Sequence, residues 1–426
     1  MPQMIGKNAL IQIISSSLSG LITFFTLSLS ARLFGPSVLG NVAYVTGLLG
    51  LVFAFSDLGF SRAQVYFTAI LKKPGKTLGT FLRLKLFLLF AAVIIALIFA
   101  LFKQATFQGL FFLMLTYELT TRLAESVFIT FEGLGESLSQ NFARFIGKLL
   151  RLAAVIVFGV SLKNNFGYSL TFVAEGLGLL ILAAVLARRF LPLNFSRNLV
   201  QKYFKYSLPF FAIIPLSYFH DNSLVVILRH FHPANQVGFF SASFQLVSFL
   251  KTLYGAVMIF FFPKMSALFS KKDLEGVKRY THLAGKYLTT LFAPIFLAAW
   301  LFRHTIIKTV LGVEFLPVAP IFSLLLASTF WLMLVAPYDQ LLFASKNHRP
   351  LILVNLADLA IVVLVSFWLV PQYGALGTVI AVSSSWFIGG LWHLWLVKSR
   401  LKITPKFFGL LNRQDIKYFK SLLKLA

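Results

Sequence analysis

The sequence predicts an all-α membrane protein with about twelve transmembrane helices. Three observations lead to this fold class. Of the 426 residues, 58% are apolar and only 12% are charged, half the charged fraction of a soluble domain, and the mean hydropathy is +0.84. The apolar residues form stretches of about 20, the length that crosses a bilayer as a helix. Basic residues lie in short runs between these stretches, as in the loops of proteins that cross a membrane many times.

Twelve stretches are long enough to be spans. They are apolar on all sides, whereas membrane strands would alternate between apolar and polar residues. We place them near 9–31, 42–70, 84–102, 108–131, 145–162, 166–187, 208–229, 237–262, 285–303, 317–343, 350–370 and 375–397. The chain runs from Lys7 directly into the first stretch without a signal-peptide cleavage pattern, so we expect that stretch to be retained.

The basic residues set the orientation. With the N-terminus inside, thirty of the 39 lie in cytoplasmic segments and six in outer segments, and Arg62, Arg122 and Lys251 fall within spans. We therefore expect a multi-pass protein of the inner (cytoplasmic) membrane with both termini cytoplasmic. The net charge of +26 then reflects topology, and we expect no nucleic-acid partner.

Several chemistries are disfavoured by what the sequence lacks. It has no Cys, and its seven His form no His-Glu-x-x-His pattern, so we expect no metal and no cofactor. Gly35 and Gly40 have the spacing of a phosphate-binding loop but continue as Asn41-Val42 without the Lys, which excludes ATP hydrolysis by such a loop. No carboxylate and nucleophile share an outer loop, so we expect no enzyme. A membrane-embedded polysaccharide polymerase or ligase is the enzymatic alternative.

An internal repeat divides the spans into two halves. Arg32-Leu-Phe-Gly-Pro36 joins the first two spans, and Arg229-His-Phe-His-Pro233 joins the seventh and eighth, 197 residues later. Gly40 and Gly238 follow the two turns. Six spans per half make the repeats parallel, an arrangement in which transporters place substrate between the halves. We predict six-helix lobes at 1–205 and 206–397, followed by a basic tail at 398–426.

These motifs carry a resemblance to a known family. They are the segments 31–36, 56–60, 236–242 and 311–312, which read Ala-Arg-Leu-Phe-Gly-Pro, Ser-Asp-Leu-Gly-Phe, Gln-Val-Gly-Phe-Phe-Ser-Ala and Leu-Gly. In order and spacing the chain resembles the polysaccharide and oligosaccharide (O-antigen type) flippases of the multidrug/oligosaccharidyl-lipid/polysaccharide exporter superfamily.

The resemblance implies both a fold and a function. The fold is a V-shaped pair of six-helix lobes. Through alternating access it would move a lipid-linked oligosaccharide, usually on undecaprenyl diphosphate, from the cytoplasmic to the outer leaflet for surface polysaccharide biosynthesis. Polysaccharide polymerase machinery is an implied partner. Relatives include multidrug extruders, so a cation-coupled multidrug extruder is the alternative.

Helix four carries the densest set of charges within a predicted span. Glu118, Arg122 and Glu125 are spaced i, i+4 and i+7, which places them on one face of a helix. Charged groups at membrane depth usually face a cavity or a partner. We predict a polar wall of the substrate cavity, with Arg122 available to a phosphate or an acidic sugar. The alternative is an ion-pair ladder that only packs against a neighbouring helix.

Three further cations are predicted to contact substrate. Lys251 lies near the middle of the eighth span, where it could receive a diphosphate; the alternative is pairing with an acid of another helix. Arg32 and Arg229 end helices on the outer side, where they could receive the diphosphate at the exit. Snorkelling to the interface is the alternative for these two.

Three residues are candidates for coupling or gating. Asp57 and Arg62 lie five residues apart in the second span, too far around a helix to pair well. Asp57 is either a coupling carboxylate or an anchor within its lobe, and we favour the anchor. Asp221 lies in the seventh span, which contains proline, and we interpret this region as a hinge or a proton site. The alternative is that the proline kink serves only helix packing.

Two charge patterns complete the prediction. The predicted spans hold three cations against seven acids, which would suit coupling to protons or Na⁺, or a cationic substrate. In the tail, apolar residues and Lys recur in helical register from Ile416 to Lys424. We predict an amphipathic segment on anionic inner-leaflet lipids, with a disordered tail as the alternative.

Overall fold

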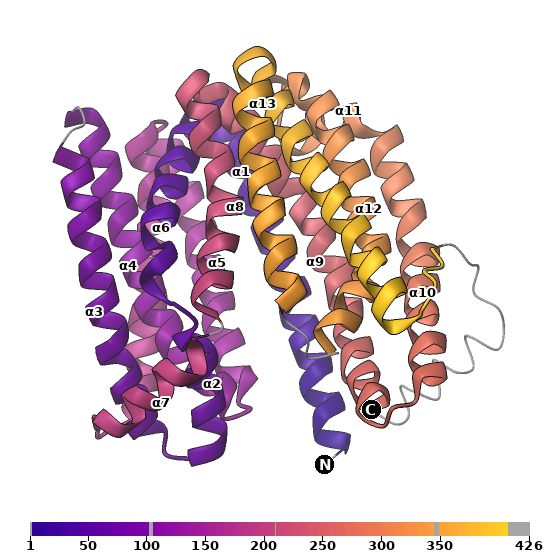
Figure 1. Ribbon diagram of the computed structural model, residues 1–426. Coiled ribbons are helices and arrows are strands. Elements are labelled where there is room, and N and C mark those ends of the chain that lie inside the picture. Colours follow the sequence, from indigo (N-terminus) through magenta and orange to yellow (C-terminus); the bar gives the residue numbers. More distant parts are fainter. Residues whose placement is uncertain (1, 102–104, 209, 345–348, 408–426) are drawn as a thin grey trace. The chain divides into compact units, whose positions relative to one another are not determined.

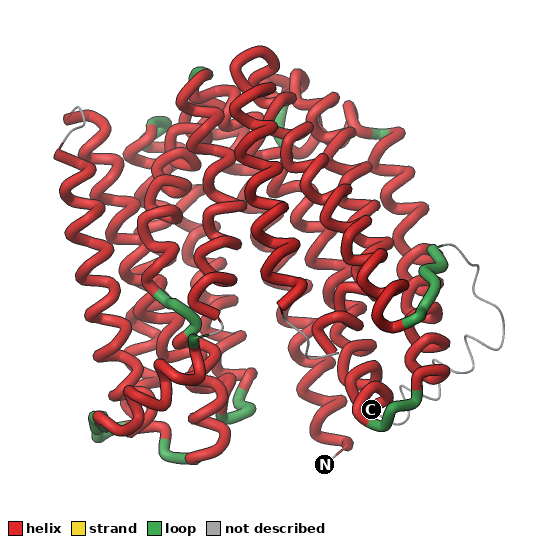
Figure 2. Tube along the Cα trace, viewed as in Figure 1, coloured by secondary structure: helices red, strands yellow, loops and turns green. Residues whose placement is uncertain are grey.

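The computed structural model describes residues 2–101, 105–208, 210–344 and 349–407. These residues form helices joined by short loops, and no strand occurs among them (Figure 2). The all-α prediction is confirmed. The predicted amphipathic stretch at 416–424 lies outside the described residues.

The helices follow one another closely along the chain (Figure 1). Their bounds are α1 Pro2–Val52, η1 Phe53–Ser56, α2 Phe60–Leu71, α3 Pro74–Leu101, α4 Ala105–Gly133, α5 Ser137–Ser161, α6 Asn165–Ala187, η2 Arg188–Phe190, α7 Arg197–Ser207, α8 Phe210–Phe231, α9 Ala234–Ser270, α10 Leu274–Leu301, α11 Arg303–Val310, η3 Val313–Val318, α12 Ala319–Ala344 and α13 Arg349–Leu401.

The two longest helices each contain a break that separates two predicted spans. Gly35 in α1 has φ 74° and ψ 172°, and Gly374 in α13 has φ 56° and ψ −130°. A positive φ costs glycine little, which explains why glycine stands at both breaks. Six helical stretches in the described part of the chain are long and apolar enough to cross a membrane, and two of them, Leu18–Ser56 and Ile352–Leu401, contain these breaks.

The second predicted span, 42–70, is not one continuous helix. The α-helix ends at Val52, passes through the 3-10 turn η1, and restarts at Phe60. Leu58 and Gly59 between them have φ 48° and 83°. Irregular backbone at membrane depth is tolerated where it is buried in protein or lines a cavity. We predicted one span over 42–70 because apolar residues dominate on both sides of the interruption, although polar residues gather at it from Ser56 to Arg62.

By its contacts the chain forms two compact units, Ile22–Ser241 and Met1–Leu21 with Ala242–Ala426. This division follows packing, whereas the predicted lobes 1–205 and 206–397 follow the sequence repeat. The lobe boundaries remain a prediction.

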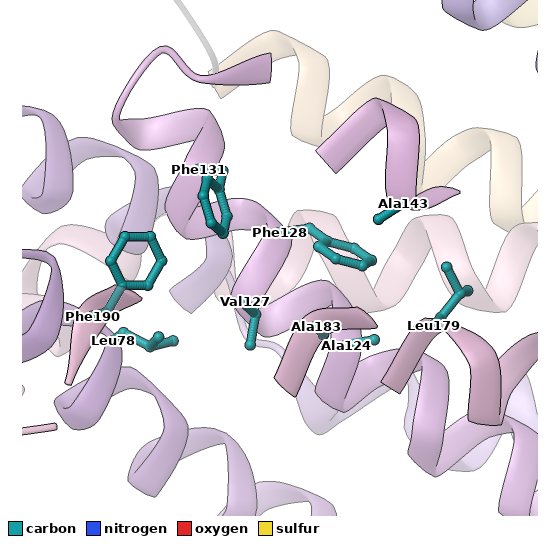
Figure 3. Packing of buried hydrophobic residues seen from close by; sticks show 9 residues of the cluster. All are labelled: Leu78, Ala124, Val127, Phe128, Phe131, Ala143, Leu179, Ala183 and Phe190. Carbon is teal, nitrogen blue, oxygen red and sulfur yellow. The ribbon is translucent and has the colours of Figure 1, made fainter. Parts of the chain in front are cut away.

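The core of the Ile22–Ser241 unit fixes the position of α4. Side chains of α3, α4, α5, α6 and η2 pack together there (Figure 3): Leu78, Ala124, Val127, Phe128, Phe131, Ala143, Leu179, Ala183 and Phe190. Gly176 of α6 allows a close approach to α4, since a Cβ on it would lie 2.3 Å from Thr120 Oγ1. One side of α4 is therefore held rigidly, which fixes the direction of its charged side chains.

The repeat glycines contact each other reciprocally within this unit. A Cβ on Gly40 would lie 1.7 Å from the Ala234 carbonyl oxygen, and a Cβ on Gly238 would lie 1.9 Å from the Pro36 carbonyl oxygen. Gly40 lies four positions after Pro36 in the sequence, just as Gly238 lies four positions after Ala234. The contact is thus nearly symmetric, and it gives a structural reason for the glycine in each half of the repeat.

An additional helix, α7, lies in the segment that we predicted only as a basic cytoplasmic loop. Its apolar side contributes Leu199 and Tyr203 to a cluster with Phe60 and Phe81. The Tyr203 hydroxyl donates to Gln64 Oε1 of α2. Burial raises the pKa of this phenol, so the hydroxyl remains a donor. Helix α7 is thereby tied to α2 and α3.

In the second unit, α12 packs against α10 and α13. Two bonds join α12 to α13: Ser328 Oγ donates to Ser383 Oγ over 2.6 Å, and Trp331 Nε1 donates to the Trp386 carbonyl over 3.1 Å. The end of the described chain is held by Tyr338, whose hydroxyl donates to the Lys406 carbonyl over 2.9 Å. Residues 402–407 are therefore attached to α12.

Candidate functional site

A cavity of about 530 Å³ lies inside the Ile22–Ser241 unit. Its walls come from the broken second span, α3, α4 and α8. The lining side chains are mostly polar or charged: Asp57, Ser61, Lys85, Glu118, Thr121, Arg122, Glu125, Ser126, Ile129, Ile214 and Tyr218. Charged side chains are costly within a bilayer, so a cavity that they line between membrane-spanning helices is a candidate functional site.

The break in the second span positions one wall of this cavity. It places Asp57 opposite Lys85 of α3, with Lys85 Nζ 2.8 Å from Asp57 Oδ1, and only 6% and 12% of these side chains are exposed. The Ser61 hydroxyl donates to the same carboxylate oxygen. Asp57 thus anchors α3 and also faces the cavity.

Arg122 is held on several sides. Its Nε donates to Glu118 Oε2 over 2.9 Å, and its Nη1 donates to Ser56 Oγ over 3.1 Å. The guanidinium carbon lies 5.0 Å from the ring centroid of Phe53 and 5.4 Å from that of Tyr218. Cation–π contacts of this kind favour a desolvated arginine. Arg122 and Glu118 therefore form an ion pair within α4 that also lines a cavity. The charged face of α4 thus has features of both interpretations, the polar cavity wall and the ion-pair ladder.

Glu125 completes the charged face of α4. Arg144 of α5 donates to both of its carboxylate oxygens, over 3.1 and 2.6 Å. Fork-to-fork pairs of this kind are geometrically specific. More than a third of each side chain remains exposed, so Glu125 is more accessible than Asp57 and Glu118, each of which is 12% exposed.

Some of the acids counted within the predicted spans are paired with cations that the prediction counted with the cytoplasmic segments. Lys85 and Arg144 are two such cations, and each pairs with an acid of a span. Glu175 of α6 likewise has Lys148 Nζ at 2.8 Å and Arg151 Nη1 at 3.5 Å. Segment boundaries drawn from hydropathy cannot detect pairs between helices. Lys85 did offer a signal, because it directly precedes the long apolar run that begins at Leu86.

The remaining predicted residues lie elsewhere. Arg62 and Arg32 are exposed, and neither lines the cavity. Asp221 has 70% of its side chain exposed, with Oδ1 3.0 Å from His220 Nδ1. Arg229 donates to the His232 carbonyl over 3.3 Å, and its guanidinium carbon is 5.9 Å from the Tyr44 ring centroid.

Lys251 belongs to the other unit. Its Nζ lies 3.5 Å from the ring centroid of Trp386 and 5.2 Å from that of Phe244. The structure thus groups Asp57, Glu118, Arg122 and Glu125 around one cavity and places Lys251 against aromatic rings of a separate unit.

A model of polysaccharide biosynthesis proteins matches residues 29–320, more than half of the chain. The chain belongs to that family. The match spans the broken second helix, all of α4 and the start of α12. A comparison with curated protein sequences gives no match.

Solved structures with a similar fold come from flippases and drug transporters. The lipid II flippase MurJ, in an inward closed conformation, has a TM-score of 0.70 at 14% identity, over 98% of this chain and 89% of that one. The MATE multidrug transporter DinF-BH has a TM-score of 0.66 at 14% identity, over 95% and 96%. The Vibrio cholerae MATE transporter VcmN has 0.56 at 14% identity, over 96% and 99%.

These likenesses establish the fold. The chain shares the helical fold of these transporters, and another neighbour with this fold, at a TM-score of 0.56, is a multidrug resistance MATE family transporter of the MOP superfamily. The predicted fold class and the recognised family are confirmed. Because flippases and drug transporters share the architecture, the choice of substrate has to be argued from the site.

Proposed function

We propose that this protein is a flippase that moves a lipid-linked oligosaccharide from the cytoplasmic to the outer leaflet for surface polysaccharide biosynthesis. The observation that carries the proposal is the cavity among the helices of the Ile22–Ser241 unit, lined by carboxylates, hydroxyls and a tyrosine ring. Polar and aromatic groups of this kind bind sugars, and the family to which the chain belongs acts in polysaccharide biosynthesis. The likeness to the lipid II flippase MurJ supports the same function.

The mechanism is alternating access of the two lobes predicted from the repeat. The sugar enters the cavity, where Glu118, Arg122 and Glu125 contact it, while the hydrocarbon tail of the carrier remains in lipid. Interactions between charged or polar groups are stronger in such a low-dielectric site than in water. Arg122 holds the Glu118 carboxylate in place through the 2.9 Å bond.

The other predicted residues are assigned to the carrier and to the conformational change. Lys251 meets the diphosphate, and Arg32 and Arg229 receive it at the outer exit. Asp57, Arg62 and Asp221 take part in coupling or gating. Polysaccharide polymerase machinery and anionic inner-leaflet lipids are the proposed partners, and the inner membrane is the proposed location.

The proposal is tested by glycan export in cells that carry substitutions. Arg122→Ala and Lys251→Ala are expected to abolish export at normal protein abundance, because the first removes the group that holds Glu118 in the cavity and the second removes the cation that meets the diphosphate. Lys202→Ala, which changes an exposed lysine of α7, is the matched control and should export normally. Full export by both Arg122→Ala and Lys251→Ala would overturn the site assignment.

A cation-coupled multidrug extruder is the second candidate. Two observations favour it: the likeness to DinF-BH, and a cavity lined by three carboxylates but two cations. Resistance of expressing cells to cationic drugs, with no change in glycan export, would select it.

A further inference from the structure

The charges that line the cavity are already paired with one another. Lys85 has Asp57 at 2.8 Å, and Arg122 has Glu118 at 2.9 Å. An additional anion would compete with these carboxylates at short distance, and like charges side by side are strongly unfavourable. Neither lining cation is therefore suited to receive a phosphate or a sugar carboxylate.

The third lining carboxylate gives the cavity a negative formal balance. Glu125 is paired with Arg144, but Arg144 is not among the lining residues. Three carboxylates and two cations therefore face the space that a ligand would occupy. This balance opposes an anionic group in the ligand.

The serine and threonine hydroxyls of the lining direct their protons away from the ligand as well. The Ser61 hydroxyl donates to Asp57, the Thr121 hydroxyl donates to the Tyr117 carbonyl over 2.7 Å, and the Ser126 hydroxyl donates to the Arg122 carbonyl over 2.9 Å. Each leaves oxygen lone pairs for a ligand. The cavity thus offers mainly acceptors, and it suits a ligand that brings donors.

We infer that this cavity binds uncharged sugar residues, or sugars bearing amino or amide groups, and excludes acidic ones such as uronic acids and phosphorylated sugars. Sugar hydroxyls, amines and amide N–H groups are donors that match the acceptors of the lining, whereas a carboxylate is an acceptor only. The inference rests on the proposed function and specifies the chemistry of its glycan. It assigns Arg122 to positioning Glu118, not to binding an anion.

The test uses purified protein in liposomes and two lipid-linked disaccharides on the same polyprenyl diphosphate. They differ only in the second sugar, which is a hexose in one and the corresponding hexuronic acid in the other. The neutral substrate is expected to reach the opposite leaflet at least about tenfold faster. A tenfold ratio corresponds to about 1.4 kcal/mol, and juxtaposed like charges cost more than that.

Two variants of α4 test whether the cavity causes the preference for the neutral substrate. Glu125→Gln removes one negative charge from the lining and keeps an amide oxygen for Arg144, so the ratio of the two rates should fall severalfold. Glu132→Gln makes the same chemical change on the same helix, at an exposed position outside the lining, and should keep the wild-type ratio. Size-exclusion profiles of both variants check that they fold.

The outcomes separate this inference from the proposed function. Protein-dependent transfer of both substrates at equal rates, or a preference for the acidic one, would overturn the inference while leaving the flippase intact. Transfer of neither substrate would overturn both. An unchanged ratio in Glu125→Gln would contradict the role of the cavity carboxylates, and the wild-type comparison stands even if that variant fails to fold.

Discussion

The reciprocal glycine contact makes a quantitative prediction for Gly238→Ala. The new Cβ would lie 1.9 Å from the Pro36 carbonyl oxygen, whereas Cβ atoms in proteins essentially never come within 3.0 Å of another heavy atom in this way. Both partners are backbone, so no side chain can rotate away and the two segments must separate. Overpacking of this kind costs about 1–3 kcal/mol or more, against a gain of about 1 kcal/mol from replacing glycine in a helix. We expect a net loss of roughly 2 kcal/mol in the free energy of unfolding.

Gly109→Ala is the matched control for this substitution. Gly109 is the fifth residue of α4, as Gly238 is of α9, and a Cβ on it meets nothing within 4 Å. This variant should gain up to about 1 kcal/mol from helix propensity alone. Unfolding of both purified variants with denaturant in detergent should therefore separate them by roughly 3 kcal/mol. Equal stabilities, or a Gly238→Ala variant more stable than wild type, would refute the close backbone contact.

Two further predictions concern buried polar groups. Asp57→Asn leaves the Lys85 ammonium buried without its counter-charge and should cost about 3–5 kcal/mol of unfolding free energy, most of which the double variant with Lys85→Met should recover; if the double variant is no more stable than Asp57→Asn, the pair is not the cause. Tyr203→Phe removes the donor to Gln64 and should lower the same free energy by about 1–2 kcal/mol, whereas an unchanged unfolding curve would show that this bond does not hold α7.

Most of the fold could be predicted because hydropathy and charge operate over whole segments. The described residues of the apolar stretches lie mostly in helices, and the breaks between neighbouring spans in α1 and α13 lie at Gly35 and Gly374. The interruption around Asp57-Leu58-Gly59 could not be found in this way. It is a local change of backbone conformation at Leu58 and Gly59, next to the buried ion pair of Asp57, and it is too short to divide a long apolar stretch.

The candidate site was predictable in part for a similar reason. Helical spacing placed Glu118, Arg122 and Glu125 on one face, and the structure shows them lining one cavity. Their partners Lys85 and Arg144 come from other helices, so only tertiary packing brings them there. From the sequence we predicted that Arg122 could bind a phosphate. The structure shows that two of its donor nitrogens are hydrogen-bonded to Glu118 and Ser56.

The central claim is tested most directly by the sidedness of lipid-linked glycan in cells with and without this gene. Labelling from one side of the membrane would measure the fraction in each leaflet. The account predicts that glycan accumulates in the cytoplasmic leaflet without the protein and returns to the outer leaflet on complementation. An unchanged distribution, together with new sensitivity to cationic drugs in the cells that lack the gene, would contradict it and identify an extruder.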